Sequence, residues 1–111
     1  MVEILDALLA GGEQPIVIDS KTLLLDPPQV LTKLCERLGL GFDPAMLSWP
    51  SGPKPEDGVW AKHWYDAVHR STGWARWKPK DDELSPKLTP VLEESLELYG
   101  RLLPYALAID P

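Results

Sequence analysis

The residues with the clearest chemical potential lie in one short stretch, residues 59–77. This stretch, VWAKHWYDAVHRSTGWARW, contains both histidines of the chain and four of its five tryptophans. Between residues 59 and 80, five lysines and arginines stand against the single acid Asp66, a net charge of +4, whereas the other residues sum to −10. Because cations attract anions and aromatic rings offer faces for stacking, the stretch predicts a contact site for an anionic partner.

The same residues also have a purely structural interpretation. Lys62, Asp66 and Arg70 recur every four residues. On a helix this spacing gives a ladder of solvated ion pairs, each worth about a few tenths of a kcal/mol. Trp60 and Trp64 have the same spacing, which is typical of aromatic side chains that pack into a core. Both interpretations remain open at this point.

The two histidines and the acid between them could form a catalytic or metal-binding group. His63, Asp66 and His69 fall at i, i+3 and i+6. Residues six apart on a helix point about 120° away from each other, so a shared metal ion is not expected. Asp66 could orient His63 as a general base, since imidazole titrates near neutrality. No nucleophile accompanies the pair, and we therefore predict no catalytic residue and no metal site.

Composition excludes several classes of protein. The 111 residues carry a formal net charge of −6, which argues against general nucleic-acid binding, where phosphate neutralisation dominates. A single cysteine allows no internal disulfide, and its spacing from the histidines gives no zinc site. No run reaches the roughly 18 to 20 apolar residues of a membrane span, and no signal peptide is recognisable. We expect one domain over residues 1–111, soluble and cytoplasmic, with no nucleic-acid and no membrane partner.

The elements that must position the candidate residues are mostly helices. The clearest one follows Asp26, which can cap it, with Pro27 in the first turn and Gln29 placed for a capping box. Its apolar stripe includes Cys35, interpreted as a small core residue, and Gly39 predicts a Schellman stop. This helix is predicted over residues 27–38, and further helices are predicted over residues 2–10, 44–47, 59–69 and 89–103. The acid Asp57 is favourable near the start of the helix predicted over residues 59–69.

One strand is predicted, at residues 15–18. Pro15 precedes a short β-branched run there, and Asp19 follows it. Its backbone groups need hydrogen-bond partners, but no second strand is recognisable in the chain. The strand is therefore expected to pair with another chain or to belong to a larger sheet. The predicted fold class is mainly α with one short strand.

Most of the chain resembles a known family. The run IVIDSKTLLLDPPQVLTKLCERLGLGFDPAML, residues 16–47, is similar to the C-terminal part of bacterial sulfotransferase-like proteins. In that family a strand ending in an acid precedes a helix with the same Asp-Pro, Leu-Cys and Leu-Gly words. The continuation SWPSGPKPEDGVWAKHWYDAVHRSTGW, residues 48–74, and the last helix with Tyr99 also resemble that group. The resemblance implies a C-terminal fragment of a P-loop α/β sulfotransferase-like fold, without the N-terminal phosphate-binding half.

The resemblance also implies a chemistry. Sulfotransferases bind 3′-phosphoadenosine 5′-phosphosulfate through a phosphate-binding loop and transfer its sulfuryl group to a hydroxyl or an amine. Such a loop needs glycines and a cation at a helix N-terminus, and this chain has no GxxxxGK-like segment. The catalytic base of the family also comes from upstream sequence. The resemblance therefore implies no sulfuryl transfer by this chain alone.

One part of the family's nucleotide site has a counterpart here. Late in the family's chain, a basic loop that contains glycine contacts the 3′-phosphate of the nucleotide. The counterpart is the 70–74 segment, which comprises Arg70, Ser71, Thr72, Gly73 and Trp74. The arginine would hold a phosphate in a bidentate manner, the two hydroxyls would donate hydrogen bonds, and the glycine would allow close backbone approach.

Three functions are compatible with these observations. The first is a catalytically inactive sulfotransferase-like module that retains the 3′-phosphate contact, with 3′-phosphoadenosine 5′-phosphosulfate or its product as the ligand. The second is a free-standing helical module for protein interaction or dimerisation. The third is one part of a two-chain or truncated sulfotransferase. We expect the first, in a homo-oligomer or with a protein partner that completes the sheet, because an orphan strand and a Trp-rich face favour pairing.

Overall fold

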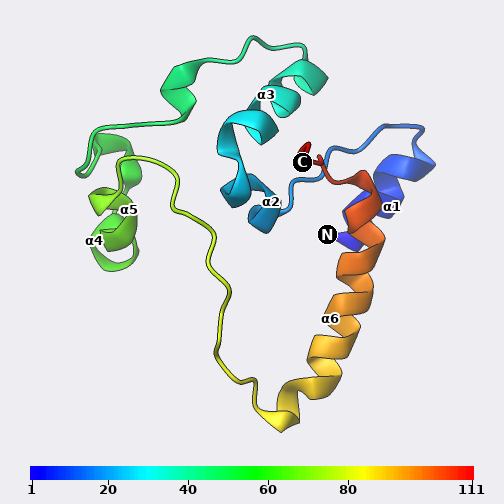
Figure 1. The fold of residues 1–111 in the computed structure, drawn as a ribbon. Helices are drawn as coiled ribbons and strands as arrows, with labels where there is room; N and C mark the ends of the chain where they lie inside the picture. The colour runs from blue at the N-terminus through cyan, green and yellow to red at the C-terminus, as the bar shows by residue number, and fades with distance from the viewer.

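Helices account for all the regular structure of the chain. The computed structural model describes residues 1–111 and contains no β-strand, only two isolated β-bridges. The α-helices are α1 (Val2–Ala10), α2 (Ser20–Leu25), α3 (Pro27–Leu38), α4 (Ala61–Trp64), α5 (Asp66–Arg70) and α6 (Thr89–Leu102). The 3₁₀ helices are η1 (Pro44–Met46), η2 (Pro55–Asp57), η3 (Pro86–Leu88) and η4 (Leu103–Tyr105). The short α4 and α5 lie together on one side of the molecule, and a long irregular connection leads from them to α6 (Figure 1).

Helix α3 forms as its local sequence predicts. The Asp26 carboxylate accepts hydrogen bonds from the Gln29 backbone N–H at 3.1 Å and from the Gln29 side-chain amide at 3.3 Å. At the other end, Gly39 has φ 69°, a left-handed conformation that glycine adopts without strain. The Leu40 N–H then donates to the Cys35 carbonyl at 2.8 Å. The predicted cap, boundaries and stop of this helix are confirmed.

The buried core is small and centres on α3. Only six of the 111 residues are buried, namely Leu5, Val30, Leu31, Cys35, Ala61 and Leu107. Three of them lie on α3, and the interpretation of Cys35 as a core residue is confirmed. The radius of gyration is 17.1 Å, whereas a compact domain of about 100 residues has a value of about 13 Å. The molecule therefore leaves most of its apolar side chains uncovered.

The predicted strand at residues 15–18 is reduced to a single bridge. Val17 pairs in parallel with Ala106, and the Val17 carbonyl accepts from the Leu107 N–H at 3.0 Å. The expectation that this run has no partner within the chain was wrong. The chain turns at η4 after the last helix, and the extended residues that follow run alongside Val17. Because only one residue pairs, no regular strand results.

Helix α2 was not predicted from the sequence. Asp19, interpreted there as the end of a strand, instead caps this helix. Its carboxylate accepts from the Thr22 N–H at 3.3 Å and from the Thr22 hydroxyl at 3.1 Å. An acid followed three residues later by a threonine could have signalled this cap, since aspartate is among the best N-cap residues.

The two ends of the chain are tied to the helices by ion pairs. The Lys33 ammonium donates to the Ala108 carbonyl at 2.7 Å and pairs with the Asp110 carboxylate at 3.3 Å, which holds the C-terminal segment against α3. Arg101 pairs with Asp6 at 2.7 Å and links α6 to α1.

Helix α6 forms almost as predicted but stands largely free. It begins at Thr89, ends at Leu102, and continues as η4. None of its residues is buried, and Val91 and Leu96 are 58% and 56% exposed. It projects away from the other helices and touches α1 near its C-terminal end (Figure 1). Even this helix, the longest at 14 residues, falls short of the length and apolarity that crossing a bilayer requires, as do the others.

Candidate functional site

The predicted helix over residues 59–69 is wrong, because two short helices replace it. Tyr65 separates α4 from α5 and has φ −103° and ψ 15°. The faces of a continuous helix therefore do not exist. Trp60 and Trp64, for which packing into a core was one of the two interpretations, are 67% and 74% exposed, so that interpretation is wrong for them.

Half of the predicted ion-pair ladder forms. The Arg70 guanidinium lies 3.1 Å from the Asp66 carboxylate, and both side chains are at least 74% exposed. Lys62 makes no ion pair. Exposed pairs of this kind contribute little to stability, so the pair leaves Arg70 available to another anion.

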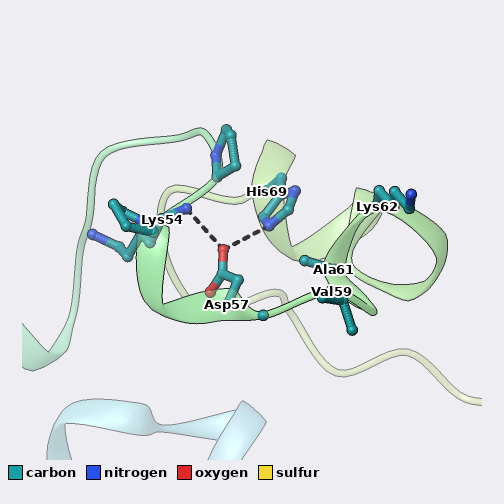
Figure 2. Close-up of a pocket in the computed structure, with 9 residues that line it drawn as sticks. Lys54, Asp57, Val59, Ala61, Lys62 and His69 are labelled. Atoms are coloured by element: carbon teal, nitrogen blue, oxygen red, sulfur yellow. Dashed lines mark hydrogen bonds and ion pairs between the residues drawn. The ribbon is translucent and has the colours of Figure 1, made fainter.

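A histidine–aspartate pair does form, but not between the residues that the sequence favoured. Asp66 is bound to Arg70, so it does not orient His63. Instead, the His69 Nε2 lies 2.9 Å from the Asp57 Oδ2, across twelve residues of sequence (Figure 2). The ring nitrogen donates and the carboxylate accepts, because an ionised carboxylate has no proton to donate. From the sequence, Asp57 was expected only to favour the start of a helix, and its pairing with His69 was not predicted.

The Asp57 carboxylate is held from two sides. The same oxygen also accepts the Lys54 backbone N–H at 2.8 Å, and both side chains of the pair are mostly shielded from solvent. The hydrogen bond from Lys54, and then that from His69, hold the pKa of Asp57 below its usual value, and burial opposes them. Asp57 is therefore ionised at neutral pH.

A pocket of about 640 Å³ opens beside this pair. The loop before and through η2, helix α4 and residue His69 of α5 line it. Asp57 and His69 lie between the loop and α4, and the Lys54 and Lys62 side chains extend at the two ends (Figure 2). This is the place where titratable groups, cations and a cavity coincide.

The 70–74 segment is braced against residues 46–49. The Ser71 hydroxyl donates to the Val68 carbonyl at 2.6 Å and accepts from the Trp49 indole N–H at 2.9 Å. The Trp49 backbone N–H donates to the Thr72 carbonyl at 3.0 Å. The Ser71 proton is thus already used within the chain, whereas the Thr72 side chain remains exposed.

Gly73 and Trp74 complete this brace. Gly73 forms an antiparallel bridge with Ser48, and a Cβ on Gly73 would lie only 3.1 Å from the Leu47 carbonyl oxygen. The Trp74 indole donates to the Met46 carbonyl at 2.9 Å. Its ring packs edge to face against the other tryptophan of the brace, with 5.8 Å between centroids. A side chain at position 73 would therefore require the neighbouring backbone to shift by a few tenths of an ångström.

The five residues predicted to contact a nucleotide divide into two groups. Ser71, Gly73 and Trp74 hold the segment in place, whereas Arg70 and Thr72 present a guanidinium and a hydroxyl to solvent. A guanidinium and a hydroxyl are both groups that can donate hydrogen bonds to a phosphate. Nucleotide binding at this segment remains a prediction.

Comparison with known proteins places the chain in a family. Residues 6–98 match the sulfotransferase domain. Two Arabidopsis thaliana proteins, branched-chain-amino-acid aminotransferase-like proteins 1 and 2, are 42% and 37% identical to this chain over 102 residues. The match covers 92% of this chain but spans only 18% of each relative. No solved structure matches the chain. Because the match to the sulfotransferase domain covers most of its residues, the chain belongs to the sulfotransferase domain family.

Proposed function

We propose that this chain is a sulfotransferase-family module that does not transfer sulfuryl groups by itself and that holds the 3′-phosphate of a nucleotide at Arg70 and Thr72. It works against a further polypeptide segment that supplies the phosphate-binding loop. The family match supports the first part, as does a sequence without a GxxxxGK-like segment. The observation that carries the proposal is the small buried core, which leaves large apolar surfaces exposed.

Six buried residues out of 111 leave too small a core for a free-standing enzyme. A domain of this size normally buries roughly two-thirds of the surface of its unfolded chain. Here α6 has no buried residue, and Trp60 and Trp64 are exposed. Exposed apolar faces of this extent mark surfaces that another polypeptide covers. The relatives, of which this chain spans 18%, are long enough to contain such a segment.

The phosphate contact rests on the exposed side of the 70–74 segment. Arg70 pairs with Asp66 in an exposed and therefore weak interaction. A phosphate presents two oxygens to the guanidinium fork and can replace the carboxylate. The exposed Thr72 hydroxyl, two residues further along the chain, supplies a further donor. The net charge of +4 between residues 59 and 80 attracts the anion to this part of the molecule.

Calorimetric titration with 3′-phosphoadenosine 5′-phosphate tests this contact. We expect saturable heat with the wild-type chain, a marked loss of affinity with Arg70→Ala, and unchanged heat with Arg37→Ala, which removes the same charge at the end of α3. Circular dichroism checks that both variants keep their helices. Unchanged affinity in Arg70→Ala would remove the assignment, and sulfation of an acceptor by the chain alone would overturn the first part of the proposal.

A second candidate function, self-association, has its own supporting observation. The backbone N–H and C=O groups of Ile16 and Ile18 make no hydrogen bonds, whereas Val17 between them bonds to the C-terminal segment. Successive residues of an extended chain direct these groups to opposite edges, so Ile16 and Ile18 form an open edge. A second copy fits it: pairing about a two-fold axis at Val17 places Ile16 opposite Ile18 of the partner subunit, and satisfies both.

Disulfide trapping tests this register. In a Cys35→Ala background, Val17→Cys should form a cross-linked dimer, because residues that face each other across such an axis lie within disulfide reach. Ile18→Cys should cross-link poorly, since the two positions are offset along the strands. Light scattering should give the mass of a dimer for the wild-type chain. A strict monomer at high concentration, or equal cross-linking of both variants, would exclude this pairing.

A further inference from the structure

We propose that the pocket between η2, α4 and α5 binds an organic phosphate or sulfate monoester, with the Nδ1 of His69 as the contact to its oxyanion. This site is separate from the exposed guanidinium of Arg70. It is built from residues that sequence reasoning did not bring together, and the inference does not depend on nucleotide binding at the 70–74 segment.

The orientation of His69 leaves one nitrogen for a ligand. Its Nε2 is bound to Asp57 at 2.9 Å, and the Tyr65 ring packs edge to face against the imidazole, with 6.1 Å between centroids. The Nδ1 has no hydrogen-bond partner, although the ring lines the pocket. An imidazolium can donate from both nitrogens. When the His69 ring is protonated, one donor faces the carboxylate and the other is available to a second anion.

The charges around the pocket favour an anion on the open side of the ring. Lys54 and Lys62 line the pocket and extend at its two ends (Figure 2). Both side chains are long and exposed, so their ammonium groups can turn toward a bound oxyanion. Asp57 is the only acid in the lining, and its oxygen already accepts two hydrogen bonds. The lining thus offers two cations and an imidazole against one acid that has its own partners.

The size and walls of the pocket indicate an ester rather than a free ion. Its volume of about 640 Å³ is in the range of small-molecule sites and far exceeds one tetrahedral oxyanion. The rest of the lining is largely apolar, formed by Pro53, Pro55, Val59 and Ala61. A small apolar group attached to the oxyanion would cover these side chains and bury part of their surface.

The imidazole signals in an NMR titration report this site directly, because the chain contains only two histidines. With phenyl phosphate as the probe, we expect saturable shifts of the His69 signals and no comparable shift of His63, which has no partner in the structure. In calorimetry, His69→Asn should weaken binding by at least about ten-fold, while the matched His63→Asn should not. Lys62→Ala, at an exposed position, should also weaken binding without affecting the fold.

Four probes separate the possible ligands. Phenyl phosphate and phenyl sulfate should bind more tightly than inorganic phosphate, and phenol should not bind. Equal affinity for inorganic phosphate would overturn the assignment to an ester. The absence of a saturable shift at His69, or equal shifts at both histidines, would overturn the site itself. In Arg70→Ala the saturable shift of the His69 signals with phenyl phosphate should persist, so a failure of nucleotide binding at the 70–74 segment is distinguishable from a failure here.

Discussion

His69 is bound to the loop before α4 through both its ring and its backbone, and Asp57 is the partner of the ring. The Nε2 to Oδ2 distance is 2.9 Å, and the His69 carbonyl accepts the Gly52 N–H at 2.6 Å. These two hydrogen bonds at one residue hold the loop of residues 52–57 against α5. The 70–74 segment, which follows directly, therefore leaves α5 from an anchored point.

A fall in pH should weaken the hydrogen bond between the His69 ring and the Asp57 carboxylate. The pKa of Asp57 is lowered by its hydrogen bonds to Lys54 and then to His69. An aspartate with a lowered pKa stabilises the folded state above its unfolded value of about 3.9, and this stabilisation is lost as the pH falls through the folded pKa. The free energy of unfolding should therefore fall more steeply below about pH 4 in the wild-type chain than in Asp57→Asn. Urea denaturation followed by tryptophan fluorescence measures both curves, and parallel curves would contradict the prediction.

A rise in pH should weaken a different contact, between Tyr99 of α6 and Asp19 at the start of α2. A hydrogen bond to the Asp19 carboxylate raises the pKa of Tyr99, and burial and the negative charge add to this effect. A raised pKa means that the neutral phenol stabilises the fold below the unfolded value of about 10, and that this stability is lost as the pH rises through the folded value. Asp19→Asn, which can still cap α2, should lower the titration midpoint of Tyr99. Phenolate absorbance measures the midpoint, and an unchanged value would refute the contact.

Two glycine substitutions should have opposite effects. In Gly73→Ala the new Cβ would lie 3.1 Å from the Leu47 carbonyl oxygen, so the neighbouring backbone would have to shift by a few tenths of an ångström. We expect a loss of about 1 to 3 kcal/mol. In Gly100→Ala nothing lies within 4 Å of the new Cβ, and the residue is in α6. Alanine should stabilise this helix by about 0.5 to 1 kcal/mol. Urea denaturation measures both, and a stabilising effect of alanine at Gly73 would refute the close packing.

Removal of the α3 cap should weaken the element that carries half of the core. Asp26→Ala deletes the acceptor of the Gln29 N–H and should cost about 1 kcal/mol. Asp26→Asn keeps a side-chain acceptor and should cost much less. The free energy of unfolding from circular dichroism compares the two variants. An equal loss in both would show that the negative charge near the helix N-terminus, rather than the hydrogen bond, provides the stabilisation.

The sequence by itself determined the features that depend on neighbours a few residues apart. The Asp26 cap, the Gly39 stop, the single turn after Asp43 and the boundaries of α6 all follow from hydrogen bonds and backbone preferences within about four residues. The order of short motifs such as Asp-Pro, Leu-Cys and Leu-Gly along residues 16–74 also carried the resemblance to sulfotransferases. The match over residues 6–98 confirmed this resemblance at the level of the family.

Only the tertiary structure decided which distant residues meet. The interruption at Tyr65 removed the continuous helix on which Asp66 could have oriented His63. The fold instead brought Asp57 of η2 to His69 of α5. The pairing of Val17 with Ala106 likewise depended on how the chain turned after α6. Such contacts are selected by packing and loop closure over many residues, and no local spacing in the sequence encodes them.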